Sequence, residues 1–455
     1  MLKKTLSTLT ANVAVFLFGL LQSVLIARAL GPPSLGKYYL IVTATAVISG
    51  IANLGFNVSS STLVAKDKSR SAALFTHSVL FSAIVGGIVL AAFHLGRGVL
   101  SQVLFKGVKD DLILLALLPV PLMVHASNWG ALLVGLGEIS FLNRYSVVTS
   151  FLSLAASAAA LFAFGMGLKG LLYVLLAYNA LLAVYGISVI SKLRGSNRFR
   201  VDPALLKESA NLGFVAHLGN IAHVLFHRMD YFIVNYFLGD KPLGYYGLAT
   251  SIAEKIWMMV SPVYNVSFSR ITGGSLAEST ALVSKLARGL TFVLLVLSIA
   301  LILSGRLVIR WVFGDPYLPA YLPMIILLPG VLFYGIHFFL GLFFIGQLQR
   351  PRVTTFISWI GLAISLPLYF GLIYGLGIHG AAIASSVTYS FIFLATFVQY
   401  SKVTGQRLRD VVVPRKREIR GLARELYDMV LLRGTGPGSR MADPASGSTE
   451  GERSK

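Results

Sequence analysis

The chain has no cysteine, and only 13% of its 455 residues are charged. Without cysteine there is no disulfide framework and no thiolate metal site. Soluble proteins carry about 25% charged residues, so the low charge content argues against a soluble domain. Acidic residues are especially scarce: 18 Asp and Glu stand against 39 Lys and Arg, and the net charge is +21. An excess of this sign suits anionic membrane lipids or an anionic substrate.

Several functional motifs are also missing. The sequence has no P-loop and no His, Cys and Asp at metal-ligand spacing. Most carboxylates lie outside the apolar stretches, and the longest loop on the expected outer side covers only residues 96–111. We therefore expect no catalytic residue, no metal and no cofactor, and we do not expect an enzyme. A basic soluble domain that could hold nucleic acid is also missing, so nucleic acid is excluded as a partner.

Long apolar stretches dominate the chain. Hydrophobic residues make up 56% of it, and they gather in stretches long enough to cross a bilayer as helices. The twelve stretches are 9–30, 38–64, 72–95, 112–136, 146–166, 170–191, 210–238, 243–266, 283–304, 318–345, 353–375 and 380–400. They lack the strict alternation of a membrane barrel, so the sequence predicts an all-α polytopic membrane protein. The first stretch is too long for a signal peptide, and we interpret it as the first span.

The stretches fall into two repeated halves. Residues 30–38 read LGPPSLGKY and residues 238–246 read LGDKPLGYY, so Leu, Gly, Leu, Gly and Tyr return after 208 residues. Nearly the same offset relates Gly165, Gly167 and Gly170 to Gly375, Gly377 and Gly380, and Gly137 to Gly346. Six spans per half give both halves the same orientation, so we predict a parallel repeat of two six-helix lobes. Such a repeat is typical of a transporter with a site between its halves.

Loop charges predict the orientation in the cell membrane. One set of loops is richer in Lys and Arg than the other, and it includes the N-terminus and the loop between the halves. By the positive-inside rule, both termini are expected in the cytoplasm.

The expected boundaries follow from this arrangement. An N-terminal lobe covers residues 1–195, a cytoplasmic linker 196–209 and a C-terminal lobe 210–400. In the linker, Asp202 and Pro203 suit the N-cap and first position of a short amphipathic helix. Residues 401–433 form a basic amphipathic segment, expected on the anionic cytoplasmic leaflet or as a solvated helix. Residues 434–455 are rich in Gly, Pro, Ser and charge, and we expect disorder.

Polar residues inside the spans mark the candidate site, because such residues are costly in a membrane and usually face a cavity or a partner. The seventh span is the richest: Asn220, His223, His227 and Asp230 fall within an arc of about 80° on a helix, and Arg228 lies on an adjacent face. The eighth span carries Glu254 and Lys255, and the first carries Asn12, Gln22 and Arg28. The alternative for each is a hydrogen bond that only joins helices.

Three segments resemble a known family. Residues 27–38 read ARALGPPSLGKY, residues 228–249 read RMDYFIVNYFLGDKPLGYYGLA and residues 374–384 read YGLGIHGAAIA. In this order, over residues 1–400, they resemble the polysaccharide-biosynthesis flippases, the O-antigen (Wzx-type) translocases. That family belongs to the multidrug/oligosaccharidyl-lipid/polysaccharide exporter superfamily, which also holds the lipid II flippase. The resemblance implies a V-shaped pair of six-helix lobes with alternating access, and a polyprenyl-(pyro)phosphate-linked glycan moved to the outer leaflet.

This cargo assigns roles to the polar residues. Arg28, Arg228 and Lys255 are candidates to hold phosphate, because guanidinium and ammonium groups pair with it directly. Asp230 and Glu254 would hold those cations in place or titrate for coupling to H⁺ or Na⁺. Glycosyltransferases and a polymerase of the same pathway are the expected protein partners. Two alternatives stay open: a cation-coupled multidrug exporter of the same superfamily, and a membrane glycan polymerase or ligase.

Overall fold

The computed structural model describes residues 2–194, 201–415 and 418, and within them all regular structure is helical. The first half contains α1 (Leu2–Ala52), α2 (Phe56–Lys66), α3 (Ser71–Val99), α4 (Asp110–Leu117), α5 (Pro119–Leu136), α6 (Ile139–Ala158) and α7 (Gly167–Arg194). The second half contains α8 (Pro203–Leu238), α9 (Asp240–Glu254), α10 (Val260–Gly273), α11 (Leu276–Val308), α12 (Tyr321–Leu342), α13 (Pro351–Thr404) and α14 (Leu408–Val412).

Short 3₁₀ and π segments extend or interrupt these helices. The 3₁₀ segments are η1 (Lys68–Arg70), η4 (Lys255–Met259) and η6 (Asp315–Ala320). The π segments are η2 (Leu100–Leu104), η3 (Ala159–Ala163), η5 (Ile309–Phe313) and η7 (Phe343–Gln347). The π segments η2 and η5 occupy equivalent positions in the two halves, because they follow the corresponding helices α3 and α11.

The predicted spans each have a helical counterpart. In the described residues, 8 helical stretches are long and apolar enough to cross a membrane. Two of these, α1 and α13, have non-helical backbone at Gly31 and Gly377, so each supplies two spans. The remaining two predicted spans correspond to α8 and to α9 with α10, which are more polar. The protein is therefore an integral membrane protein with the predicted all-α architecture of twelve spans.

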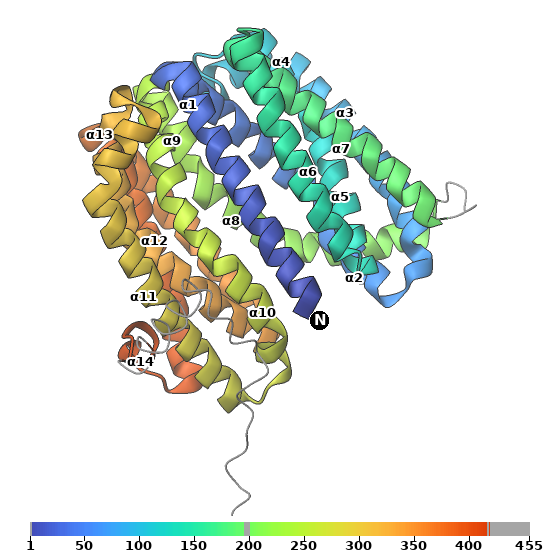
Figure 1. Cartoon of the computed structure of the whole chain (residues 1–455). Coiled ribbons are helices and arrows are strands. Elements are labelled where there is room, and N and C mark those ends of the chain that lie inside the picture. Colours follow the sequence, from blue (N-terminus) through green and yellow to red (C-terminus); the bar gives the residue numbers. More distant parts are fainter. Residues whose placement is uncertain (1, 195–200, 416–417, 419–455) are drawn as a thin grey trace, which may run out of the picture.

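The two halves form two lobes that meet at one end of the molecule and diverge below it (Figure 1). At the meeting end, the kink of α1 packs on the start of α9, and Lys37 Nζ lies 3.5 Å from an Asp240 carboxylate oxygen. We call this the closed end. Gly31 and Gly239 both have positive φ there, 69° and 85°, which glycine adopts without steric cost. The two turns lie at the same end, as a parallel repeat requires.

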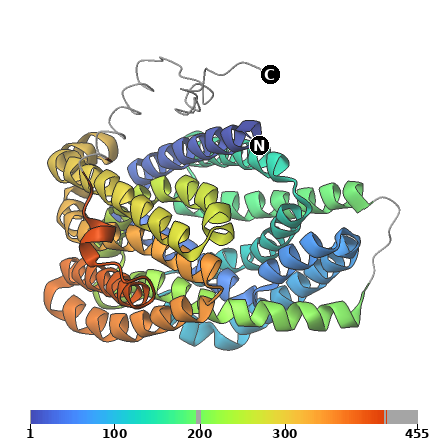
Figure 2. The ribbon, with the colours of Figure 1, turned by 90° about the horizontal axis from the view of Figure 1, so that it is seen from below.

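Helix α8 joins the lobes. Its 36 residues run from the far end of the N-terminal lobe to the closed end, along one side of the molecule (Figures 1 and 2). Near its start, Ser209 shares a 2.7 Å hydrogen bond with Ser59 of α2. Arg70 Nη1 lies 3.0 Å from a Glu208 carboxylate oxygen. These contacts fasten the first turns of α8 to the first lobe, and the rest of the helix packs on α9 and α13 of the second lobe and on α1 of the first.

The linker helix differs from the expectation in length. Asp202 is the N-cap, and its carboxylate accepts a 3.0 Å hydrogen bond from the Leu205 amide. The predicted short helix is not separate, however, because it continues without a break into the seventh span. No proline follows Pro203 in α8. Gly213 does not end the helix either; it lies within α8 and packs on Gly55, which precedes α2. The basic segment predicted over 401–433 is described only at residues 401–415 and 418, where α13 continues to Thr404 and α14 follows at Leu408–Val412. The rest of that segment and the tail predicted over 434–455 lie outside the described residues.

Candidate functional site

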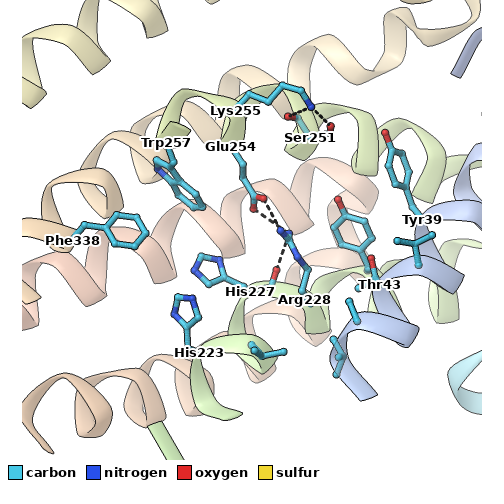
Figure 3. A pocket seen from close by; sticks show the side chains of 15 residues that line it. Tyr39, Thr43, His223, His227, Arg228, Ser251, Glu254, Lys255, Trp257 and Phe338 are labelled. Atoms are coloured by element: carbon cyan, nitrogen blue, oxygen red, sulfur yellow. Dashed lines mark hydrogen bonds and ion pairs between the residues drawn. The ribbon is translucent and has the colours of Figure 1, made fainter. Parts of the chain in front are cut away.

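A cavity of about 700 Å³ lies between the two halves (Figure 3). The first half contributes α1, and the second contributes α8, the junction of α9 with η4, and α12. The lining residues are Tyr39, Val42, Thr43, Ala46, Val47, His223, Val224, His227, Arg228, Tyr231, Ser251, Glu254, Lys255, Trp257 and Phe338. Because both lobes contribute walls, a relative movement of the lobes changes access to this space.

The centre of the cavity holds an ion pair between two helices. Arg228 on α8 donates to both carboxylate oxygens of Glu254, over 3.2 and 2.9 Å. Glu254 also accepts a 3.3 Å hydrogen bond from the Tyr389 hydroxyl. Such a two-point arrangement fixes the guanidinium plane. The carboxylate neutralises Arg228 and also holds it in a defined position in the cavity.

Lys255 adds a second positive charge to the cavity. Its ammonium donates to the Ser251 hydroxyl, 3.1 Å away on the same helical stretch. Among the described residues, no Asp or Glu forms a salt bridge with it. Lys255 begins η4, where the eighth span changes from α to 3₁₀ geometry. In a water-excluded setting, an ammonium group held only by neutral oxygens attracts an anion strongly.

Aromatic rings form the wall beside these charges. His227 Nδ1 lies 3.0 Å from the Tyr389 hydroxyl, and His223 Nδ1 lies 3.2 Å from the Tyr334 hydroxyl. The Trp257 indole donates a 2.7 Å hydrogen bond to the Val331 carbonyl, which fixes its ring against His227. The cavity therefore has a charged side and an aromatic side.

The structure brings five of the ten sequence-predicted site residues into this cavity: His223, His227, Arg228, Glu254 and Lys255. Asn220 lines a smaller cavity beside it. Asp230 is only 1% exposed and lies inside the second lobe, where it accepts a 2.6 Å hydrogen bond from Tyr246.

The three candidates of the first span lie elsewhere. Gln22 donates to Ser153 and Ser157 of α6 inside the first lobe. Asn12 is exposed near the start of α1 and lines neither cavity. Arg28 crosses to the second lobe at the closed end, where it donates to the backbone carbonyls of Trp311 and Val312.

Sequence reasoning missed several residues of the cavity, among them Tyr39, Thr43, Ser251, Trp257 and Phe338. Most are ordinary components of an apolar span, and nothing in the sequence distinguishes them as cavity residues. Tyr39 is an exception, because its repeat counterpart is Gly247. A Cβ atom at Gly247 would collide with the Tyr39 ring. The large side chain of Tyr39 therefore packs between the lobes on the glycine at the equivalent position of the other repeat.

Comparison with solved structures identifies the fold. The lipid II flippase MurJ in an inward closed conformation matches with a TM-score of 0.74 and 13% identity, over 96% of this chain and 94% of that one. An inward-facing multidrug resistance MATE family transporter of the MOP superfamily matches with a TM-score of 0.68 and 15% identity, over 88% and 98%. A MOP superfamily transporter from Pyrococcus furiosus, described as having a binding pocket of reverse polarity, matches with a TM-score of 0.63 and 14% identity, over 88% and 96%.

Comparison with curated proteins gave no match. The family model described as "Polysaccharide biosynthesis protein" matches residues 1–272, which is more than half of the chain. The match includes the first lobe, α8, α9 and the Arg228–Glu254 pair of the cavity. The chain therefore belongs to the polysaccharide biosynthesis protein family and has the two-lobed fold of the MOP superfamily.

Proposed function

We propose that this protein moves a polyprenyl-(pyro)phosphate-linked glycan from the cytoplasmic to the outer leaflet of the cell membrane by alternating access. The observation that carries the proposal is the cavity between the lobes, where Arg228 and Lys255 stand beside a single carboxylate. The phosphate of such a cargo needs cations, and its glycan needs a space shielded from hydrocarbon. The polyprenyl chain can stay in the bilayer, because only the head group enters the cavity.

The direction follows from the predicted orientation. If both termini are cytoplasmic, the closed end faces outside and the lobes diverge towards the cytoplasm. In this conformation the space between the lobes is then open to the cytoplasm, where the cargo is made. Orientation can be tested with single cysteines, since the chain has none. Ser69→Cys should resist an impermeant reagent added to intact cells, whereas Gln102→Cys should react; the opposite result contradicts the orientation.

The chemistry of the cavity favours an anionic cargo over the alternatives. A multidrug exporter of cations requires unpaired carboxylates, but Glu254 is already bound to Arg228. A glycan polymerase or ligase requires an acid, base or nucleophile arranged around a reacting bond, and the lining residues form no such arrangement.

We place coupling to H⁺ or Na⁺ at Asp230. This carboxylate is buried among hydroxyl groups, since Tyr246 also lies 2.9 Å from Ser385, which lies 3.0 Å from Tyr369. Oxygen atoms of this kind suit either a proton or a small cation. Asp230 lies on α8 two residues from Arg228, so a change of its charge state can act on the cavity through one helix.

The decisive experiment is transport in vesicles. Purified protein is reconstituted with fluorescent polyprenyl-pyrophosphate-linked sugar, and the fraction that reaches the outer leaflet is followed by reductive quenching. We expect flipping by the wild type and at least a tenfold lower rate for Lys255→Ala, since loss of a charged contact costs about 1.5–3 kcal/mol. Lys241→Ala removes an exposed lysine outside the cavity and should flip normally. Equal rates for both variants would contradict the proposal.

A further inference from the structure

A second cavity of about 180 Å³ continues the central one along the seam between α1 and α8. On α1 the lining passes from Val47 to Gly50, and on α8 from Val224 to Asn220. A Cβ atom at Gly50 would lie 3.8 Å from the Val224 side chain, so Gly50 of the second cavity and Val224 of the central one are neighbours. A ligand in the central cavity can therefore extend into the second one.

The second cavity lies where the second span is broken. Helix α1 ends at Ala52, Leu54 and Gly55 have φ of 49° and 75°, and α2 begins at Phe56. Its repeat counterpart, the eighth span, is also interrupted, by η4 at Lys255–Met259, about one and a half helical turns before the position that corresponds to Asn53–Gly55. Non-helical backbone at membrane depth is tolerated only where it is buried in protein or lines a cavity, and paired interruptions in two halves mark binding sites. The η4 interruption lines the central cavity, and the Asn53–Gly55 interruption lines the second.

The lining of the second cavity is polar but uncharged. Its polar side chains are Ser49, Asn53, Asn57, Ser127, His217 and Asn220. The Asn53 amide donates a 2.9 Å hydrogen bond to Asn128, which fixes it in place. His217 is 2% exposed, and its Nε2 atom has no hydrogen-bond partner among the described residues. A buried polar atom without a partner is costly, so the cavity has hydrogen-bonding capacity to offer a ligand.

This chemistry excludes phosphate and cations as the ligand. No arginine or lysine lines the second cavity to balance a phosphate, and no carboxylate lines it to balance a cation. Amides, hydroxyls and imidazole both donate and accept hydrogen bonds, as hydroxyl groups do. The matching ligand is neutral and rich in hydroxyl groups.

We propose that the second cavity binds the hydroxyl groups of a sugar while the central cavity holds the phosphate to which that sugar is linked. This inference rests on the proposed function and adds a site that recognises the glycan. The two cavities adjoin along α1 and α8, as the phosphate and the sugar adjoin in the cargo. The cavity would therefore determine which glycan is accepted, and Arg228 with Lys255 would bind any polyprenyl pyrophosphate.

The test measures competition for binding to the purified full-length protein. The tracer is fluorescent polyprenyl pyrophosphate without sugar. The competitors are unlabelled polyprenyl pyrophosphate and the lipid-linked glycans extracted from membranes of the source cells. For the wild type, we expect the glycan-bearing lipids to compete about tenfold better, which corresponds to 1.4 kcal/mol. For Asn57→Ala and Asn220→Leu, this ratio should fall to about one, and the tracer should bind as before.

Controls separate the outcomes. Asn211→Leu makes the same change as Asn220→Leu on an exposed residue of the same helix that lines neither cavity, and it should keep the tenfold ratio. Asn220 is exposed, so its variant should fold, and the melting temperature of each variant checks this. A wild type without preference for the glycan, or variants that keep the tenfold ratio or weaken both competitors equally, would overturn the second site. If the tracer itself fails to bind the wild type, the proposed function fails first.

Discussion

Gly36 and Gly244, which occupy the same position in the two repeats, pack on each other's turn at the closed end. A Cβ atom at Gly36 would collide with the Asp240 carbonyl and lie 2.9 Å from the Gly244 nitrogen, and one at Gly244 would collide with the Pro32 carbonyl. The repeated glycines thus form one of the contacts between the halves. Their conservation across the repeat is explained by the close approach of two backbones, which leaves no room for a side chain.

Substitution of Gly244 should therefore separate the lobes at the closed end. Gly244→Ala overpacks a backbone contact, and we expect a loss of about 1–3 kcal/mol of stability. The midpoint of thermal unfolding in detergent checks this. Gly19→Ala is the matched control, because a Cβ atom there meets nothing within 4 Å and alanine favours helix. A Gly244→Ala protein as stable as Gly19→Ala would show that the turns adapt.

Arg28 should act as a latch between the lobes. Its Nε atom donates over 2.7 Å to the Val312 carbonyl, and the Tyr317 hydroxyl donates over 2.6 Å to the Ala27 carbonyl beside it. We expect Arg28→Ala to favour opening at this end. A Ser251→Cys reporter in the cavity should then react with an impermeant reagent from outside at least several times faster than in the Arg28 background. Unchanged labelling would leave Arg28 without a gating role.

The Arg228–Glu254 pair allows its structural and functional roles to be separated. Arg228→Ala leaves Glu254 without its cation, with 15% of the side chain exposed, and should cost about 2 kcal/mol of stability. The double variant Arg228→Ala/Glu254→Gln removes both charges and should recover membrane accumulation. It should not recover flipping if Arg228 binds phosphate. A double variant that both accumulates and flips would reduce the pair to a helix–helix contact.

How far the sequence predicts this structure depends on the range of each interaction. The spans, the repeat and the Asp202 cap depend on local composition and on offsets along the chain, and the structure has them. The polar stripe of α8 was also predicted, and it places His223 and His227 on the cavity. Asp230 shares that stripe but lies closer to the closed end, where α9 and α13 cover it, so its burial depends on packing that helical periodicity does not contain.

The interaction partner of a side chain was harder to predict from the sequence than the helix on which the side chain lies. Arg228 and Asp230 are close in sequence, yet the partner of Arg228 is Glu254, because the approach of α8 and α9 brings those side chains together. Likewise, Arg28 has the residue type of a phosphate ligand, but the kink at Gly31 directs it to the second lobe. The break at Asn53–Gly55 lay inside an apolar stretch that reads as one continuous span.

Asp230 should determine the response to an ion gradient. Asp230→Asn keeps the size of the side chain and removes its charge, so the hydroxyl network can persist. We expect this variant to flip at a rate that no longer depends on a pH or Na⁺ gradient across the vesicle, whereas the wild-type rate should change with one of them. Separate imposition of each gradient identifies the ion. A wild type insensitive to both, or a variant with wild-type sensitivity, contradicts coupling at Asp230.

The segment after α13 should detach at acidic pH. Arg288 of α11 binds both carboxylate oxygens of Glu418 at 2.6–3.1 Å, and Val411 of α14 is fully buried nearby. The hydrogen bonds from Arg288 hold the pKa of Glu418 below its usual 4.5. A carboxyl group with a lowered pKa contributes stability that is complete above the unfolded value and is lost as pH falls through the folded value.

Amide exchange of residues 408–412, corrected for the intrinsic rate at each pH, measures this detachment. In the wild type, protection should be constant above about pH 4.5 and should fall below it. In Glu418→Gln, protection should be low at every pH, because the variant lacks the charge at all of them. Glu138→Gln alters an exposed glutamate in the other lobe and should behave as the wild type. Protection in Glu418→Gln equal to that of the wild type at neutral pH would show that burial of Val411 alone holds the segment.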